Sequence, residues 1–264
     1  MTEYSNNRVL IFNQAPTTSG AAAQIVVGQA NFLSDVAGCS ATELDSPESA
    51  FVVDGKLIVA DRGNHRVLIW NKVPTANGTP ADLVLGQGSF GTCVHNNDDQ
   101  DASPDSRPSA RTLYRPSDVW SDGKRLFVAD TGNNRILIWN NFPTSHFTPA
   151  NTVLGQADFA TNDSATGADG FNVPHFLTSN GNQLFVADAD NHRVLVWNTL
   201  PTTNGAFADR VIGQPDFSTH VQNAGQPAPH AQGLSSPTGL ALHDNRLIVA
   251  DRINFRYLAF QAAD

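Results

Sequence analysis

The sequence repeats itself, and this repeat limits the chain to architectures built by stacking copies of one unit. Each complete unit contains the segment Val-Ala-Asp-x-x-Asn-x-Arg between short runs of apolar residues. The repeated aspartates of the complete copies are Asp61, Asp130, Asp188 and Asp251. A half copy at residues 5–13 opens the chain. A core that no single unit can bury alone forms when such units stack on one another.

The spacing inside the unit is constant. A proline lies 14 residues before each repeated Asp, and an Arg lies five residues after it. Four short β-branched runs, at residues 49–53, 57–60, 67–70 and 83–85 of the first complete unit, predict four strands per unit. These runs are apolar nearly throughout and do not alternate, which indicates sheets covered on both faces.

The repeated pattern resembles the NHL repeat, and Val-Ala-Asp-Thr-Gly-Asn-Asn-Arg at residues 128–135 carries the resemblance most fully. It extends over essentially the whole chain and implies an all-β fold, a β-propeller in one domain spanning residues 1–264. Counting first and second strands predicts four blades of four antiparallel strands, closed by joining the N- and C-terminal strands. Because six blades are common in this family, part of a six-bladed propeller is the alternative.

The charge balance argues against two classes of partner. The chain has 16 basic and 25 acidic residues and a net charge of −9, whereas a nucleic-acid binder or an anionic-membrane binder needs a basic face. No run approaches the roughly 20 apolar residues of a membrane helix. We therefore expect neither nucleic-acid binding nor membrane insertion. The sequence does not set the oligomeric state.

Location and redox state follow less directly from the sequence. No signal peptide is visible at Met1, and we expect an extracellular or periplasmic protein that has lost its signal. Cys39 and Cys93 fall in the first two loops between units, which are neighbours on one face of a propeller. A disulfide and two free thiols are both compatible with this placement.

The residues that recur in every unit have a structural interpretation. The repeated Asp and Arg are expected to satisfy backbone groups at the turn between the second and third strands. An aromatic residue ends each third strand and is expected to pack between blades, with a repeated sugar-binding platform as the alternative. These residues are Phe12, Trp70, Trp139, Trp197 and Phe260.

The residues that break the repeat are better candidates for function. First strands line the channel of a propeller, and their first positions would meet at one mouth. Glu48 and His175 directly follow the repeated proline in their units, and Asp118 lies one position further on. This mixture of carboxylates and imidazole predicts a ligand-binding site and a site for a divalent metal such as calcium or zinc. An ordinary solvated channel mouth is the alternative.

Two functions remain in competition. The first is an extracellular or periplasmic recognition scaffold that engages a protein or glycan through its loop-rich face. The alternative is a metal-dependent propeller hydrolase or lyase with its site at the central channel. Gluconolactonase-like enzymes and the peptidylglycine amidating lyase are similar in architecture, but their metal ligands are not matched here. No phosphate-binding loop or nucleophile elbow appears, so catalytic residues stay unassigned and the scaffold is favoured.

Overall fold

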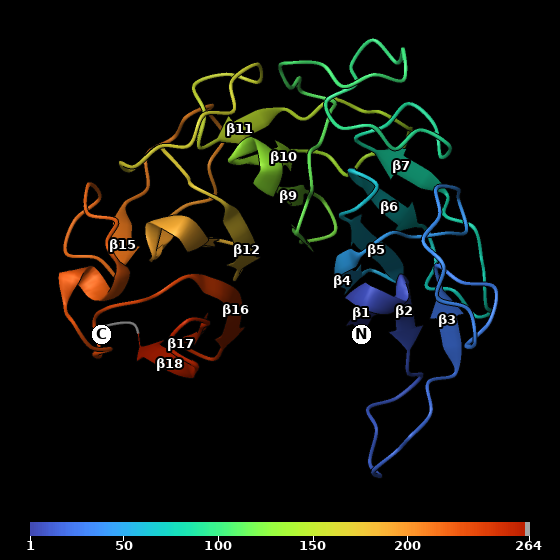
Figure 1. Cartoon of the computed structure of the whole chain (residues 1–264), viewed down its shortest axis with the longest axis horizontal. Coiled ribbons are helices and arrows are strands. Elements are labelled where there is room, and N and C mark those ends of the chain that lie inside the picture. Colours follow the sequence, from blue (N-terminus) through green and yellow to red (C-terminus); the bar gives the residue numbers. More distant parts are fainter. Residues whose placement is uncertain (262–264) are drawn as a thin grey trace.

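The computed structural model describes residues 1–261, which form five antiparallel sheets arranged radially around a central axis, as in a β-propeller (Figure 1). The first sheet contains β1 (Thr2–Glu3), β2 (Arg8–Ile11) and β3 (Ile25–Val27). The second contains β4 (Pro47–Val53), β5 (Lys56–Asp61), β6 (Arg66–Trp70) and β7 (Leu83–Leu85).

The remaining sheets repeat this order along the chain. The third sheet contains β8 (Asp118–Ser121), β9 (Leu126–Asp130), β10 (Arg135–Trp139) and β11 (Thr152–Leu154). The fourth contains β12 (Pro174–Ser179), β13 (Leu184–Asp188), β14 (Arg193–Trp197) and β15 (Arg210–Ile212). The fifth contains β16 (Pro237–His243), β17 (Arg246–Asp251) and β18 (Arg256–Gln261).

The prediction of four blades closed by joining the chain ends is wrong. The terminal strands form two separate sheets, and within residues 1–261 no strand of the first sheet pairs with a strand of the fifth (Figure 1). The physical reason is that each end supplies its own second and third strands. Joining the two ends would give one blade two second strands and two third strands. The alternative, that the chain is part of a six-bladed propeller, stays a prediction.

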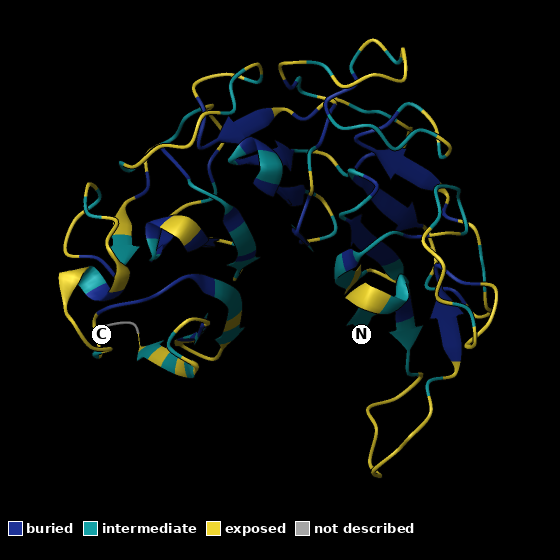
Figure 2. Cartoon of the chain, viewed as in Figure 1, coloured by how far each residue is buried: buried dark blue, intermediate teal, exposed yellow. Residues whose placement is uncertain are grey.

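The core lies between neighbouring sheets. Strands β5, β6 and β7 of the second sheet are buried almost completely, as are their counterparts in the third sheet (Figure 2). Side chains of both sheets interdigitate in one apolar cluster that contains Ile58, Leu85 and Val128. Burial on both faces explains why these runs are apolar throughout. The third strands of the two terminal sheets, β2 and β18, are more exposed (Figure 2).

The repeated Asp and Arg tie each blade to the loops beside it, as predicted. The Arg66 guanidinium is fully buried and donates to Asp61 Oδ2 at 2.7 Å. It also donates to the backbone carbonyls of Phe90, Ser40 and Glu43, at 2.5, 2.9 and 2.9 Å. Arg135 and Arg193 make the same four kinds of contact in their sheets.

The aromatic residues that end the third strands are packing residues in the blades that have neighbours on both sides. Trp70, Trp139 and Trp197 are 1–2% exposed. Each indole N–H donates to a backbone carbonyl in the loop between the third and fourth strands of its own sheet. We call these three segments, residues 71–82, 140–151 and 198–209, the edge loops. Buried indoles of this kind are not available as sugar platforms.

Cys39 and Cys93 form a disulfide that joins the first two loops between sheets, with their Cα atoms 6.4 Å apart. The structure thus resolves the choice that the sequence left open. In residues 1–261, no helix has the length and apolar character needed to cross a membrane.

Candidate binding site at the channel mouth

The repeated prolines shape the mouth of the central channel. In the second, fourth and fifth sheets a β-bulge follows the proline, so that one residue is left out of the pairing register. The bulged residues are Glu48, His175 and Thr238. A bulge re-aims its side chain away from the regular sheet positions. The sequence therefore places its non-repeating residues where the backbone turns them towards the mouth.

Two of the three predicted site residues meet there. Glu48 Oε1 lies 3.1 Å from His175 Nε2, and Glu48 Oε2 lies 2.8 Å from Arg62 Nε. The Glu48 carboxylate thus bridges the second and fourth sheets across the channel. The Nδ1 atom of His175 is buried and has no hydrogen-bond partner among residues 1–261. Glu48 Oε2 and Arg62 Nε are also buried and, although close, make no hydrogen bond, so this polar cluster has unused hydrogen-bonding capacity.

The third predicted residue, Asp118, lies behind the mouth. Its side chain accepts hydrogen bonds from Ser49 Oγ at 2.5 Å and from the Leu177 N–H at 2.9 Å. Asp118 is 5% exposed, and this burial raises its pKa to about 7 against the lowering effect of the two donors. Its carboxyl group joins the first strands of three consecutive sheets. Because its pKa is about 7, this group is partly protonated at physiological pH.

The mouth forms a pocket of about 510 Å³. Its lining comes from four of the five sheets and consists of Tyr4, Glu48, Arg62, His175, Phe176, Thr238 and Arg252. Arg62 and Arg252 occupy the position directly after the repeated Asp, where the third and fourth sheets have Thr131 and Ala189. The sequence analysis missed both arginines. The sequence did contain a signal for them, which is the constant spacing of 14 residues between the repeated proline and the repeated Asp. In the structure these two residues pair directly, as Pro47 does with Asp61, so the residues that follow them are close together.

A metal held jointly by Glu48, Asp118 and His175 stays a prediction, and the geometry does not favour it. Across residues 1–261 no three His, Cys, Asp or Glu side chains are arranged to hold a metal ion. Glu48 is paired with Arg62, and the Asp118 oxygens are used within the protein. The pocket instead offers two guanidinium groups, one imidazole and two aromatic rings to a ligand.

The unusual pKa of Asp118 leads to a pH-dependent stability. The folded chain keeps a proton on this carboxyl up to pH of about 7, whereas the unfolded chain releases it near the ordinary value of 3.8. The free energy of unfolding should therefore fall as pH rises from about 4 to about 7 and be level above that. Asp118→Asn should remove this pH-dependent contribution to the free energy of unfolding, which is on the order of 4 kcal/mol between pH 4 and pH 7. Denaturant titrations of both proteins at pH 4, 5.5, 7 and 8.5 check this, and parallel profiles would contradict it.

The comparisons with known proteins agree with this architecture. Residues 171–197 match the model of the NHL repeat. A putative phosphatase from Bacteroides thetaiotaomicron shares the fold, with a TM-score of 0.51, 12% identity, and coverage of 88% of this chain and 52% of that one. A chain in a nidogen–laminin complex has a TM-score of 0.48 and 17% identity, with 83% of this chain and 61% of that chain covered.

This chain spans about three fifths of the length of the nidogen–laminin chain and about half of the length of the putative phosphatase. A putative 6-phosphogluconolactonase from Bacteroides fragilis is 13% identical with a TM-score of 0.42, and 83% of this chain and 67% of that one are covered. No curated protein sequence matches the chain. At 12% identity the putative phosphatase bears on the fold alone. The chain thus contains an NHL repeat at residues 171–197, and this matched segment belongs to one of the four complete copies of the unit in the sequence.

Proposed function

We propose that the chain is an extracellular or periplasmic binding scaffold that engages a protein or glycan across its loop-rich face. The observation that carries the proposal is the mouth pocket, to which four sheets contribute side chains that the repeat itself does not require. Repeat propellers present such non-repeating positions on a rigid frame, which suits recognition. The Cys39–Cys93 disulfide supports a location outside the reducing cytosol.

The chemistry of the pocket suggests the part of the ligand that enters it. The Arg62 guanidinium is paired with Glu48, while Arg252 has no salt bridge within residues 1–261. With one paired arginine, one unpaired arginine and an imidazole, the pocket favours a carboxylate or another anionic group. The ring of Phe176 stacks on His175 with centroids 5.3 Å apart and adds an apolar wall. An acidic side chain of a protein and an acidic sugar both fit this description.

An experiment with matched variants tests the proposal. Oxidised chain would be screened on arrays of acidic peptides and of glycans, and the hits measured by calorimetry against His175→Ala and Arg252→Ala. We expect at least about tenfold weaker binding for both, because each loses a charged or polar contact. Melting temperatures should change little, since neither side chain belongs to the repeated network.

His243→Ala is the control variant. His243 ends β16 at the far end of its first strand, and its side chain is 80% exposed. Its replacement should leave binding unchanged. Hits that bind the two mouth variants as tightly as the original chain would remove the mouth from the binding surface and with it the proposal.

The hydrolase or lyase alternative rests on one observation, the buried Asp118 carboxyl with a pKa of about 7 behind the pocket. A carboxyl group with a pKa near the working pH can both donate and accept a proton, which suits general acid–base chemistry. Elemental analysis of the same oxidised samples separates the two functions, because a stoichiometric divalent metal would favour the enzyme.

A further inference from the structure

One hydrogen bond recurs at each junction between consecutive sheets of residues 1–261. The residue before the repeated Arg has a side-chain acceptor, which binds the backbone N–H of the residue before the repeated proline in the next unit. The four donor–acceptor distances lie between 2.8 and 3.2 Å. We call these contacts clasps, and they are Asn7–Ser46, His65–Arg115, Asn134–Val173 and His192–Ser236.

Each clasp joins two residues whose backbone is in the left-handed region. The acceptor residues have φ between 51° and 56°, and the donor residues have φ between 50° and 57°. Asn and His tolerate this region better than most residues, which suits them to the acceptor position. For donors such as Arg115 and Val173 a positive φ is unfavourable. The bond to their N–H therefore stabilises strained backbone at the start of a first strand.

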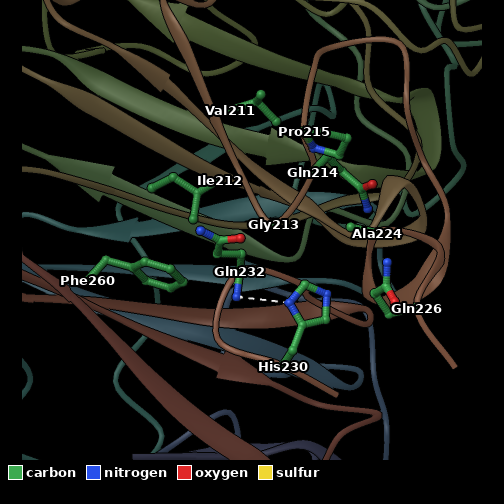
Figure 3. A pocket seen from close by; sticks show the side chains of 10 residues that line it. All are labelled: Val211, Ile212, Gly213, Gln214, Pro215, Ala224, Gln226, His230, Gln232 and Phe260. Atoms are coloured by element: carbon green, nitrogen blue, oxygen red, sulfur yellow. Dashed lines mark hydrogen bonds between the residues drawn. The ribbon is translucent and has the colours of Figure 1, made fainter. Parts of the chain in front are cut away.

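A repeated Gln fixes the backbone of each acceptor residue separately from its side chain. Its Nε2 donates to the carbonyl of that residue, as Gln87 does to His65 at 3.1 Å and Gln214 does to His192 at 3.0 Å. Figure 3 shows Gln214 in the wall of a hollow of about 630 Å³, which another imidazole, that of His230, also lines. Because the backbone is fixed in this way, a change in the acceptor atom acts on the clasp directly.

The clasps are of two chemical kinds, which alternate from one junction to the next. Asn7 and Asn134 accept through an amide oxygen, which does not titrate. His65 and His192 accept through Nδ1, which requires a neutral imidazole with its proton on Nε2. A protonated imidazole has N–H groups on both nitrogens and would oppose the backbone N–H. Only the neutral form of these two histidines can therefore close a clasp.

The surroundings of His65 favour the neutral form. Burial lowers the pKa of His65 to about 4, and cationic neighbours act in the same direction. The facing groups that titrate or carry a charge are His95, Tyr114, Arg115, Arg62 and Asp45, of which Asp45 acts to raise the pKa. The His95 ring packs edge-on against the His65 ring, with centroids 5.4 Å apart. A second imidazole beside the first adds to the cost of protonation.

Burial also lowers the pKa of His192. The charged and titratable groups that face it are His220, which lowers the pKa, and Asp190 and Asp251, which raise it. For both histidines the pKa in the closed clasp lies below the ordinary value of 6.5. An open clasp therefore binds a proton more readily than a closed one, and its population rises as pH falls below about 6.5.

We propose that His65 and His192 are acid-sensitive clasps, which open as pH falls and release the first strands of the third and fifth sheets at their starts. The imidazole of an open clasp reaches water and takes up a proton, which keeps the clasp open. The clusters between these sheets consist of aliphatic and aromatic side chains, which do not titrate. Acid thus loosens the segments before β8 and β16 while the sheets stay packed.

The released segments lead into the mouth of the channel. Ser236 lies two residues before Thr238, which lines the mouth pocket, and Arg115 lies three residues before Asp118. Opening the clasps would therefore disturb the backbone that positions these side chains. This consequence for binding rests on the proposed function, whereas the clasps themselves are tested without a ligand.

Amide hydrogen exchange, measured by NMR on the oxidised and isotope-labelled chain, compares the two kinds of clasp within one molecule. After correction for the intrinsic pH dependence of exchange, protection of the Arg115 amide should fall at least about tenfold between pH 7 and pH 4.5. Protection of the Ser236 amide should fall as well. The Ser46 and Val173 amides are the internal controls and should stay within about twofold. Equal changes at all four amides would report general stability and overturn the proposal.

His65→Asn and His192→Asn convert the acid-sensitive clasps to the amide kind, as in Asn134–Val173. In urea titrations both variants should match the original chain at pH 7.5. At pH 4.5 the unfolding equilibrium constant of His65→Asn should be at least about tenfold smaller than that of the original chain. The other titrating groups, Asp118 among them, are common to both chains and cancel in this comparison. Parallel pH profiles would overturn the proposal.

His65→Leu separates the clasp from the mere burial of an imidazole. It removes the acceptor at every pH, so it should unfold at a lower urea concentration than His65→Asn at pH 7.5. Equal stability of these two variants would show that the acceptor has no role and would also overturn the proposal. His243→Asn is the control, because its side chain is 80% exposed, and it should change neither the exchange nor the pH profile. None of these measurements depends on what the mouth binds.

Discussion

Arg66→Ala is expected to lower the free energy of unfolding by about 3–5 kcal/mol, because the change breaks a buried ion pair and leaves one partner uncompensated. Both Arg66 and Asp61 have fully buried side chains, and the guanidinium also satisfies three backbone carbonyls. Urea unfolding followed by tryptophan fluorescence measures the loss. Arg135→Ala and Arg193→Ala should lose similar amounts, since their contacts are the same.

Arg256→Ala is the matched control for these three changes. Arg256 pairs with Asp251 at 2.7 Å, but its side chain is 25% exposed and it bonds two backbone carbonyls where Arg66 bonds three. We expect a loss of about 1–2 kcal/mol there. Equal losses at all four positions would show that burial does not set the cost. Full stability with loss of ligand binding alone would move the function into the repeated motif.

Most of the fold could be predicted from the sequence, because each local feature of the repeat occurs in four complete copies. The constant spacing between Pro47 and Asp61 appears in the structure as a direct cross-strand pair, and the spacing between Asp61 and Arg66 as a buried ion pair. Apolar runs without alternation correctly indicated sheets covered on both faces. Each of these inferences depended on neighbours within one unit, where sequence distance and spatial distance are closely linked.

The chain ends could not be assigned in the same way. β1 has two residues, and Glu3 stands where complete copies have Asp, so the short second strand of the first sheet left no recognisable pattern. The Glu3 carboxylate nevertheless pairs with Arg8 at 2.5 Å and repeats the geometry of the other units. Whether two incomplete units merge or remain separate depends on contacts between chain ends, which no local spacing reports.

The candidate site could be predicted from the sequence only in part. Glu48 and His175 were found because they break the repeat on strands that line the channel, and the structure brings them within 3.1 Å. Arg62 and Arg252 were missed because they lie on the turn between the second and third strands, which the sequence suggested was structural. Asp118 was placed on the correct strand, but it pairs with Ala129 in regular register and is 5% exposed, so it lies behind the open mouth.

Loss of the Cys39–Cys93 disulfide is the second change with a large expected effect. The two cysteines are separated by 54 residues, and closing a loop of that length removes unfolded-state entropy equivalent to about 4 kcal/mol. Cys39→Ser combined with Cys93→Ser should therefore unfold at a markedly lower denaturant concentration than the oxidised chain. Treating the original chain with a reducing agent should produce the same shift.

The loops that this disulfide joins are the loops that Arg66 holds. Arg66 donates to Ser40 in the first loop, directly after Cys39, and to Phe90 in the second loop, three residues before Cys93. The third and fourth sheets keep the equivalent arginine contacts without a disulfide, so the bridge adds to a connection that already exists. A reducing agent should leave the double serine variant unchanged, which controls for other effects of the reagent. If the oxidised chain and the double variant unfold together, the loops are already as restricted without the bridge, and the repeated arginines alone hold this face.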